Sequence, residues 1–222
     1  MARPSRADLQ RLKRLVRYLV GKPRVVWTFA CQSPATEITA FSDSDWAGCR
    51  RTARSTSGGA LCLGSHCLRT YSVTQKAVSL SSAEAELMAL VKATSEAIGI
   101  QQLAASWGLT LDIGVHVDSS AALAVTARKG NGKLRHVRIG HLWVQELAEA
   151  EVVRFAKVHG VANPADLMTK HLAGQRSTEL ASALAQQPRA GHAECRIALT
   201  ALCKAPLPDE ARASGARQEA YF

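Results

Sequence analysis

Four acidic residues stand where the predicted strands and helices of this 222-residue sequence meet, and they are the first candidates for chemistry. Asp43 and Asp118 each end a short apolar run. Glu86 lies in the first turns of a long predicted helix, and Asp166 opens another. Carboxylates that converge on one point can hold two divalent ions about 3.5–4 Å apart, which support in-line displacement at phosphorus. Mg²⁺ suits such a site because it prefers hard oxygen ligands.

Each acid also has an ordinary structural explanation. A carboxylate in the first turn of a helix, such as Asp166, is stabilised by the helix dipole. Asp118 is suited to a turn at a strand end, and Glu86 to a solvent-exposed helix face. Asp43 competes with Asp45, which lies on the same face of the same strand. A single acid is therefore weak evidence, and the hypothesis rests on the four together in this order.

Two glutamates compete at the start of the long helix. The segment Ser81-Ser-Ala-Glu84 has the pattern of a capping box, in which Glu84 reaches back to the helix start. Glu86 lies two positions on, roughly opposite on the helix. It begins a face of small and apolar residues that carries no other charge, so Glu86 is the preferred metal ligand.

Hydrophobic periodicity predicts an α/β domain of alternating strands and helices. The first helix, over 8–20, precedes a main domain expected at 36–172, and a partly disordered tail is expected at 173–222. Gly64-Ser65 predicts a hairpin turn. Ser119 or Ser120 is expected to cap a short helix, and Asn163 the last one. The expected strands are 38–43, 59–64, 68–73, 115–118 and 152–158, and the expected main-domain helices are 82–107, 121–127, 137–150 and one from 163 onward.

The charge is strongly basic, with a net value of +10. Residues 1–26 hold eight arginines and lysines against the single Asp8, and so supply seven of those ten charges. Such an excess favours a phosphate-rich or anionic partner, although a solvated helix face explains the N-terminal cluster equally well. Since no run of 18 apolar residues occurs, we expect no membrane-spanning helix.

The cysteines and histidines do not suggest a zinc site. None of the six cysteines forms a Cys-x-x-Cys pair, so we expect free thiols in a reducing compartment. His136 and His141 are five positions apart, about 140° around a helix, and so share no metal-binding face. His159 precedes Asp166 in the chain and is a candidate for proton transfer or product release, with a packing role as the alternative.

Several segments together resemble the ribonuclease H domain of copia-type LTR retrotransposon Pol polyproteins. A basic helix at residues 8–21 is similar to the one that joins the reverse transcriptase to that domain, and the likeness covers roughly residues 3–172. The matching segments are Phe41-Ser-Asp-Ser-Asp-Trp-Ala-Gly48, Arg54-Ser-Thr-Ser-Gly58, Ser81-Ser-Ala-Glu-Ala-Glu86, Val117-Asp-Ser-Ser-Ala121, Arg135-His-Val-Arg-Ile-Gly-His141 and Ala165-Asp-Leu-Met-Thr-Lys170.

The resemblance implies a ribonuclease H-like fold, with a five-stranded mixed sheet flanked by helices. It implies metal ligation by Asp43, Glu86, Asp118 and Asp166, with Mg²⁺ as the ion and Mn²⁺ as an alternative. The implied activity is cleavage of the RNA strand of RNA/DNA hybrids, leaving a 3′-hydroxyl and a 5′-phosphate. The implied partners are the hybrid and the rest of Pol, in the cytoplasm within a virus-like particle or in the nucleus, with no membrane partner and the oligomeric state left open.

Two departures from the family pattern leave a second function open. Ser119 and Ser120 stand where the family has Asn and Gln, and Leu134-Arg-His-Val137 replaces Lys-His-Ile-Asp. The polymerase portion is not in this sequence, which implies a C-terminal fragment of Pol. The alternatives are therefore an active nuclease, a nucleic-acid-binding remnant without turnover, and a structural fragment without a present role.

Overall fold

The computed structural model describes residues 5–130, 132, 140 and 142–189. The chain divides into two units, of which Val25–Gln187 is the larger. The smaller unit contains α1 (Arg6–Gly21), a helix with no buried residue. A capping box opens α1, because Ser5 Oγ accepts a hydrogen bond from Asp8 N at 3.2 Å while Asp8 Oδ2 accepts one from Ser5 N at 2.9 Å. None of the described helices is long and apolar enough to cross a membrane.

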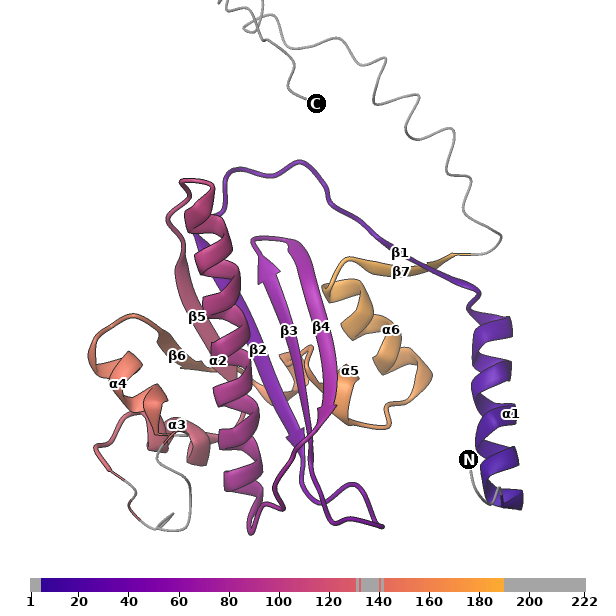
Figure 1. Ribbon diagram of the computed structural model, residues 1–222. Helices are drawn as coiled ribbons and strands as arrows, with labels where there is room; N and C mark the ends of the chain where they lie inside the picture. The colour runs from indigo at the N-terminus through magenta and orange to yellow at the C-terminus, as the bar shows by residue number, and fades with distance from the viewer. Residues whose placement is uncertain (1–4, 131, 133–139, 141, 190–222) are drawn as a thin grey trace, which may run out of the picture. The chain divides into compact units, whose positions relative to one another are not determined.

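A five-stranded mixed sheet forms the centre of the larger unit (Figure 1). The strand order is β4-β3-β2-β5-β6. Strands β4, β3 and β2 pair antiparallel, whereas β5 and β6 continue from β2 in parallel. The five-stranded mixed sheet predicted from the sequence is therefore confirmed. The strands are β2 (Glu37–Asp45), β3 (Thr56–Leu63), β4 (His66–Thr74), β5 (Asp112–Val117) and β6 (Arg154–Lys157).

Helices flank both faces of this sheet. The long helix α2 (Ser82–Ser106) lies across one face, as Figure 1 shows, and buries Leu87, Leu90 and Ala93 against the strands. On that face it joins α3 (Ser120–Thr126) and α4 (Trp143–Glu149). The opposite face carries α5 (Asp166–Thr169), which contacts β2, β3 and β4, followed by α6 (Gly174–Ala183).

Alternation along β2 sends its side chains to both layers. Ile38 and Ala40 are fully buried in the α2 layer, and Ser44 shares their face. Asp43 points to the other face, toward α5. The end of β2 is therefore where side chains from the two helical layers can meet.

Some elements differ from those predicted. The order expected to end near residue 173 continues through α6, because Leu180 and Leu184, four positions apart, are both buried. A second sheet pairs β1 (Arg24–Trp27) with β7 (Gln186–Arg189), which the sequence did not predict. The helix predicted over 137–150 is described only as α4, since residues 137–139 and 141 lie outside the described part of the chain.

Candidate metal centre

Three of the predicted acids converge at one end of the sheet. Asp43, Glu86 and Asp118 each offer a carboxylate oxygen, and these oxygens lie within 4.8 Å of one another. The pairing of β2 with β5 explains two of them, because Ser42 is opposite Val117 in a parallel ladder and the next residue of each strand is an acid. Glu86 arrives from the second turn of α2, which packs across both strands.

Glu86 is the least satisfied of the three carboxylates. Its Oε1 accepts hydrogen bonds from Ser44 Oγ at 2.9 Å and from Ser44 N at 3.3 Å. Its Oε2 is buried and has no hydrogen-bond partner among the described residues. Burial, together with the neighbouring charges of Asp43 and Asp118, raises the pKa of Glu86 to about 8, although the Ser44 hydrogen bonds act the other way. A proton or a cation at Oε2 would relieve this cost.

Glu84 has a structural task, as predicted, but its partner differs. Ser81 Oγ accepts a hydrogen bond from Glu84 N at 3.2 Å, which is the expected N-cap. The Glu84 carboxylate accepts from Leu80 N at 2.8 Å, one residue before the backbone N–H that a capping box uses. Glu84 thus tightens the entry to α2 and is not part of the carboxylate cluster.

Asp43 is held from the α5 side of the sheet. Its side chain is 2% exposed, and it accepts hydrogen bonds from Thr169 Oγ1 and, at 3.1 Å, from Lys170 Nζ. Burial raises the pKa of Asp43, against the lowering effect of these two donors. Gly58, opposite Asp43 in the sheet, permits the approach of α5, because a Cβ at Gly58 would lie 2.7 Å from the Cβ of Met168.

Asp166 is near this cluster but does not belong to it. Its Oδ1 lies 2.6 Å from Lys170 Nζ, so one ammonium group bridges Asp43 and Asp166. Although burial lowers the pKa of Lys170, the two carboxylates outweigh burial and raise it. The structure therefore brings three predicted ligands together directly and connects the fourth through a lysine that the sequence reasoning did not single out. The i,i+4 spacing of Asp166 and Lys170 was the available sequence signal.

Asn163 fixes the segment that leads into α5. It is fully buried, and its Nδ2 donates to the Ser42 carbonyl oxygen at 3.0 Å. Its Oδ1 accepts from Ala165 N at 3.1 Å, whereas the N-cap of the four-residue helix is Ala165. The prediction that Asn163 is the helix N-cap is therefore wrong, because the residue instead ties the turn before α5 to β2.

The loop that contains His159 lies beside the third acid. An ideal Cβ built on Gly160 would be 3.4 Å from Asp118 Oδ2. His159 Nδ1 accepts a hydrogen bond from Val161 N at 3.4 Å and so caps a short 3-10 helix, η2 (Gly160–Ala162). Beyond Asp118, Ser119 caps α3 through Ala122 N at 3.2 Å, as predicted. His136 and His141 lie outside the described residues.

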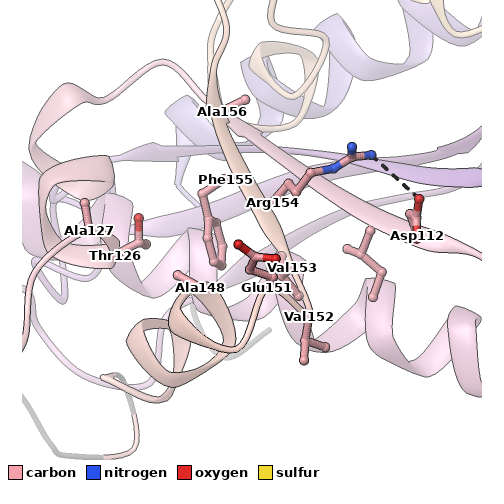
Figure 2. Close-up of a pocket in the computed structure, with 11 residues that line it drawn as sticks. Asp112, Thr126, Ala127, Ala148, Glu151, Val152, Val153, Arg154, Phe155 and Ala156 are labelled. Atoms are coloured by element: carbon pink, nitrogen blue, oxygen red, sulfur yellow. Dashed lines mark ion pairs between the residues drawn. The ribbon is translucent and has the colours of Figure 1, made fainter.

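A cavity of about 770 Å³ lies elsewhere, between β6 and the ends of α3 and α4 (Figure 2). None of the four acids lines it. Figure 2 shows the Phe155 ring between Thr126 and Glu151, with Arg154 directed toward Asp112 at 4.0 Å. The carboxylate cluster is thus not the floor of this cavity, and no part of the site's chemistry depends on it.

The cluster has the composition that a hard divalent cation requires. Its three groups offer only oxygen ligands, as Mg²⁺ prefers, and Glu86 presents a buried oxygen with no partner among the described residues. The described cysteines lie elsewhere and do not join it. A divalent cation would offset the repulsion among the three carboxylates, so the residues fit such an ion.

Comparisons with known proteins support the relationship that the motifs indicated. No protein-family model matches the chain. The retrovirus-related Pol polyprotein from transposon RE1 of Arabidopsis thaliana is 31% identical over 175 residues, which are 78% of this chain and 12% of that protein. The corresponding polyprotein from transposon TNT 1-94 of Nicotiana tabacum is 25% identical over 169 residues, or 75% of this chain and 13% of that protein.

Among solved structures, LC11-RNase H1 in complex with an RNA/DNA hybrid aligns with a TM-score of 0.41 at 16% identity, over 60% of this chain and 93% of that one. The chain spans about an eighth of the length of the two polyproteins. Over about three quarters of its length, the chain is a homologue of the retrovirus-related Pol polyproteins of transposons.

Proposed function

We propose that the chain is a metal-dependent endonuclease that hydrolyses the RNA strand of RNA/DNA hybrids, as the ribonuclease H part of a Pol polyprotein. The observation that carries this proposal is the convergence of Asp43, Glu86 and Asp118, with oxygens within 4.8 Å of one another, in a homologue of transposon Pol proteins. The strand order, with β2 at its centre and its parallel and antiparallel partners on either side, supports the same assignment.

The metal ligands in this proposal are Asp43, Glu86 and Asp118, with Asp166 as a fourth once it separates from Lys170. Two bound Mg²⁺ or Mn²⁺ ions would supply charge stabilisation for the attacking and leaving oxygens of an in-line displacement.

Neighbouring side chains position these ligands before any ion binds. Ser44 orients Glu86 by donating two hydrogen bonds to Oε1. Thr169 and Lys170 hold Asp43, and Asn163 fastens the segment that carries them. His159, in the loop beside Asp118, is proposed to help proton transfer or product release.

The proposed substrate is a long polymer that lies across the surface, so the site does not need an enclosed pocket. Recognition would depend on hybrid shape and the RNA 2′-hydroxyls more than on base sequence. The basic residues of α1 would add phosphate contacts. We further propose that the remaining part of Pol is the physiological partner, in the cytoplasm or the nucleus.

A cleavage assay tests this function. An end-labelled RNA/DNA hybrid is incubated with the protein in Mg²⁺ or in chelator, and the products are compared with those of Glu86→Gln. The expected result is Mg²⁺-dependent cutting of the RNA strand by the parent and none by Glu86→Gln.

Glu84→Gln is the matched control, because Glu84 is also a buried glutamate of α2 but only caps the helix. It should retain cutting at a temperature where it is folded. Hybrid binding without cutting by the parent would favour the non-catalytic remnant, and equal loss in both variants would remove the assignment of Glu86 as a ligand.

A further inference from the structure

Two buried cysteines face each other across the β3–β4 hairpin, far along the sheet from the acids. Strand β3 ends at Leu63 and β4 begins at His66, so the turn is Gly64-Ser65, with Gly64 at φ +58°. Cys62 and Cys67, the next pair inward, are direct cross-strand partners. The sequence reasoning treated both as isolated free thiols, because their spacing matches no metal motif.

The position of the pair favours close sulfur contact. Residues that flank a two-residue hairpin turn exchange the backbone hydrogen bonds, so the next pair is a non-hydrogen-bonded one, with Cα atoms about 4.5 Å apart and side chains nearest each other. Disulfides form across Cα separations of about 4.4–6.8 Å. The register shift between Leu61 and Cys62 lies directly beside the pair. A bulge of this kind can re-aim neighbouring side chains.

The two thiols already interact in the structure. Cys62 donates a hydrogen bond to Cys67, which raises the pKa of the Cys62 thiol and lowers the pKa of the Cys67 thiol. Gln186 Nε2 lies 4.0 Å from Cys67 Sγ as a further donor. Cys67 is therefore the better nucleophile of the two, and Cys62 is placed to attack the product.

We propose that Cys62 and Cys67 are a redox-active dithiol that low-molecular-weight disulfides convert to a cross-strand disulfide. In the first step the Cys67 thiolate attacks the reagent disulfide, forms a mixed disulfide and releases one thiol. In the second step the Cys62 thiolate attacks the Cys67 sulfur and releases the second thiol. The two cysteines lose two electrons and two protons, and the reagent disulfide gains them as two thiols.

The C-terminal segment of the larger unit controls access to this pair. Cys62 is 8% exposed and Cys67 is 1% exposed, in a small cluster that also contains Ala60 and Leu184. Leu184 follows α6, which packs over this part of the sheet, and Gln186 begins β7. Oxidation therefore requires local opening of α6 and β7, so the pair should react more slowly than the exposed Cys31 but with closure in place of a lasting adduct.

The disulfide should also be easy to reduce again. It would close a loop of only four intervening residues, and short loops constrain the unfolded chain least. The reduced form loses no buried charge or hydrogen bond to water by remaining closed. These two features favour a reversible redox site, independent of the nuclease proposal.

The test uses the full chain and glutathione. The protein is equilibrated at a series of reduced-to-oxidised glutathione ratios, remaining thiols are alkylated, and tryptic peptides are weighed. Both cysteines lie in one expected peptide, residues 55–69, because cleavage follows Arg54 and Arg69. The expected result is that this peptide changes from doubly alkylated to unalkylated with loss of two hydrogens, while Cys31 and Cys49 gain glutathione.

Two controls keep the outcome decisive. Cys62→Ser should leave a stable glutathione adduct on Cys67, because the resolving thiol is missing. A second series at a urea concentration just below the unfolding transition should speed closure by opening the cover. The proposal is overturned if residues 55–69 remain doubly alkylated in both series, or if they accumulate glutathione adducts without closure.

Discussion

Replacing Glu86 with Gln should stabilise the metal-free protein while abolishing its response to Mg²⁺. The reason is the position of the Glu86 carboxyl, which is largely buried beside Asp43 and Asp118 and has one oxygen without a partner among the described residues. An ionised carboxyl there opposes folding. The amide of Gln can still accept from Ser44, and its N–H groups would face the neighbouring carboxylates.

The magnitude follows from the pKa of Glu86, which is about 8 in the folded protein against an ordinary value of 4.5. Each pKa unit corresponds to about 1.36 kcal/mol. Because the folded-state pKa is the higher one, the folded state is favoured below about pH 4.5 and loses stability as pH rises toward 8. The loss is about 3 kcal/mol at neutral pH and approaches about 5 kcal/mol above pH 8. For a domain of this size, 3 kcal/mol is roughly 6–12 °C in Tm.

The assay is thermal melting in chelator near about pH 5 and about pH 8, then in millimolar Mg²⁺ at the higher pH. We expect the Glu86→Gln variant to melt close to the parent in acid and well above it in alkali. Mg²⁺ should raise the Tm of the parent and leave the variant almost unchanged. Glu84→Gln serves as the control and should melt lower at both pH values, because it weakens the cap to Leu80 N. Identical pH profiles for the parent and Glu86→Gln would refute the reasoning that Glu86 is strained.

The other predictions concern the remaining acids, their lysine and the basic helix. Lys170→Met should lower the metal-free free energy of unfolding by at most about 3 kcal/mol, since Lys170 is 40% exposed, and should enlarge the Mg²⁺-induced rise in Tm. An unchanged Mg²⁺ response in melting would show that this ammonium does not compete with the ion. Asp118→Asn should lose hybrid cleavage, whereas Asp166→Asn should retain part of it, and equal cleavage rates for the two would contradict the placement of Asp166 outside the cluster. Deleting residues 1–24 in a non-cleaving background should weaken hybrid binding and flatten its salt dependence by about 0.9 logarithmic units per lost phosphate contact, as measured by fluorescence anisotropy; an unchanged slope would assign the helix to a solvated face.

The sheet and three of its acids were accessible from sequence because local pattern and global geometry agree. Alternation marks β2 as a strand, and an acid follows the apolar runs of both β2 and β5. When two such strands pair in parallel, their final residues meet at one edge, so Asp43 and Asp118 converge without any further information. Glu86 was distinguished from Glu84 by the capping pattern alone, and the structure places the two side chains as that pattern required.

The partners of those acids were not accessible, because they depend on contacts between elements distant in sequence. Ser44 binds Glu86 across 42 positions, and Lys170 reaches Asp43 across 127. Nothing local distinguishes these residues from other serines and lysines. The helix α6 was missed for a related reason, since it begins without a side-chain cap and its burial depends on Leu180 and Leu184 finding the far face of the sheet.

Charge balance at the site explains why Asp166 stands apart. Four ionised carboxylates and one ammonium would leave three negative charges, and the raised pKa of Glu86 favours a proton on that group near neutral pH, which leaves two. Lys170 therefore stabilises Asp43 and Asp166 in the absence of a metal, and Asp43, Glu86 and Asp118 keep the capacity to bind a first divalent cation without moving the lysine. Full use of Asp166 as a ligand requires Lys170 to withdraw toward solvent, which its 40% exposure allows. The same lysine that makes the metal-free fold tolerable thus sets the cost of completing a four-carboxylate site.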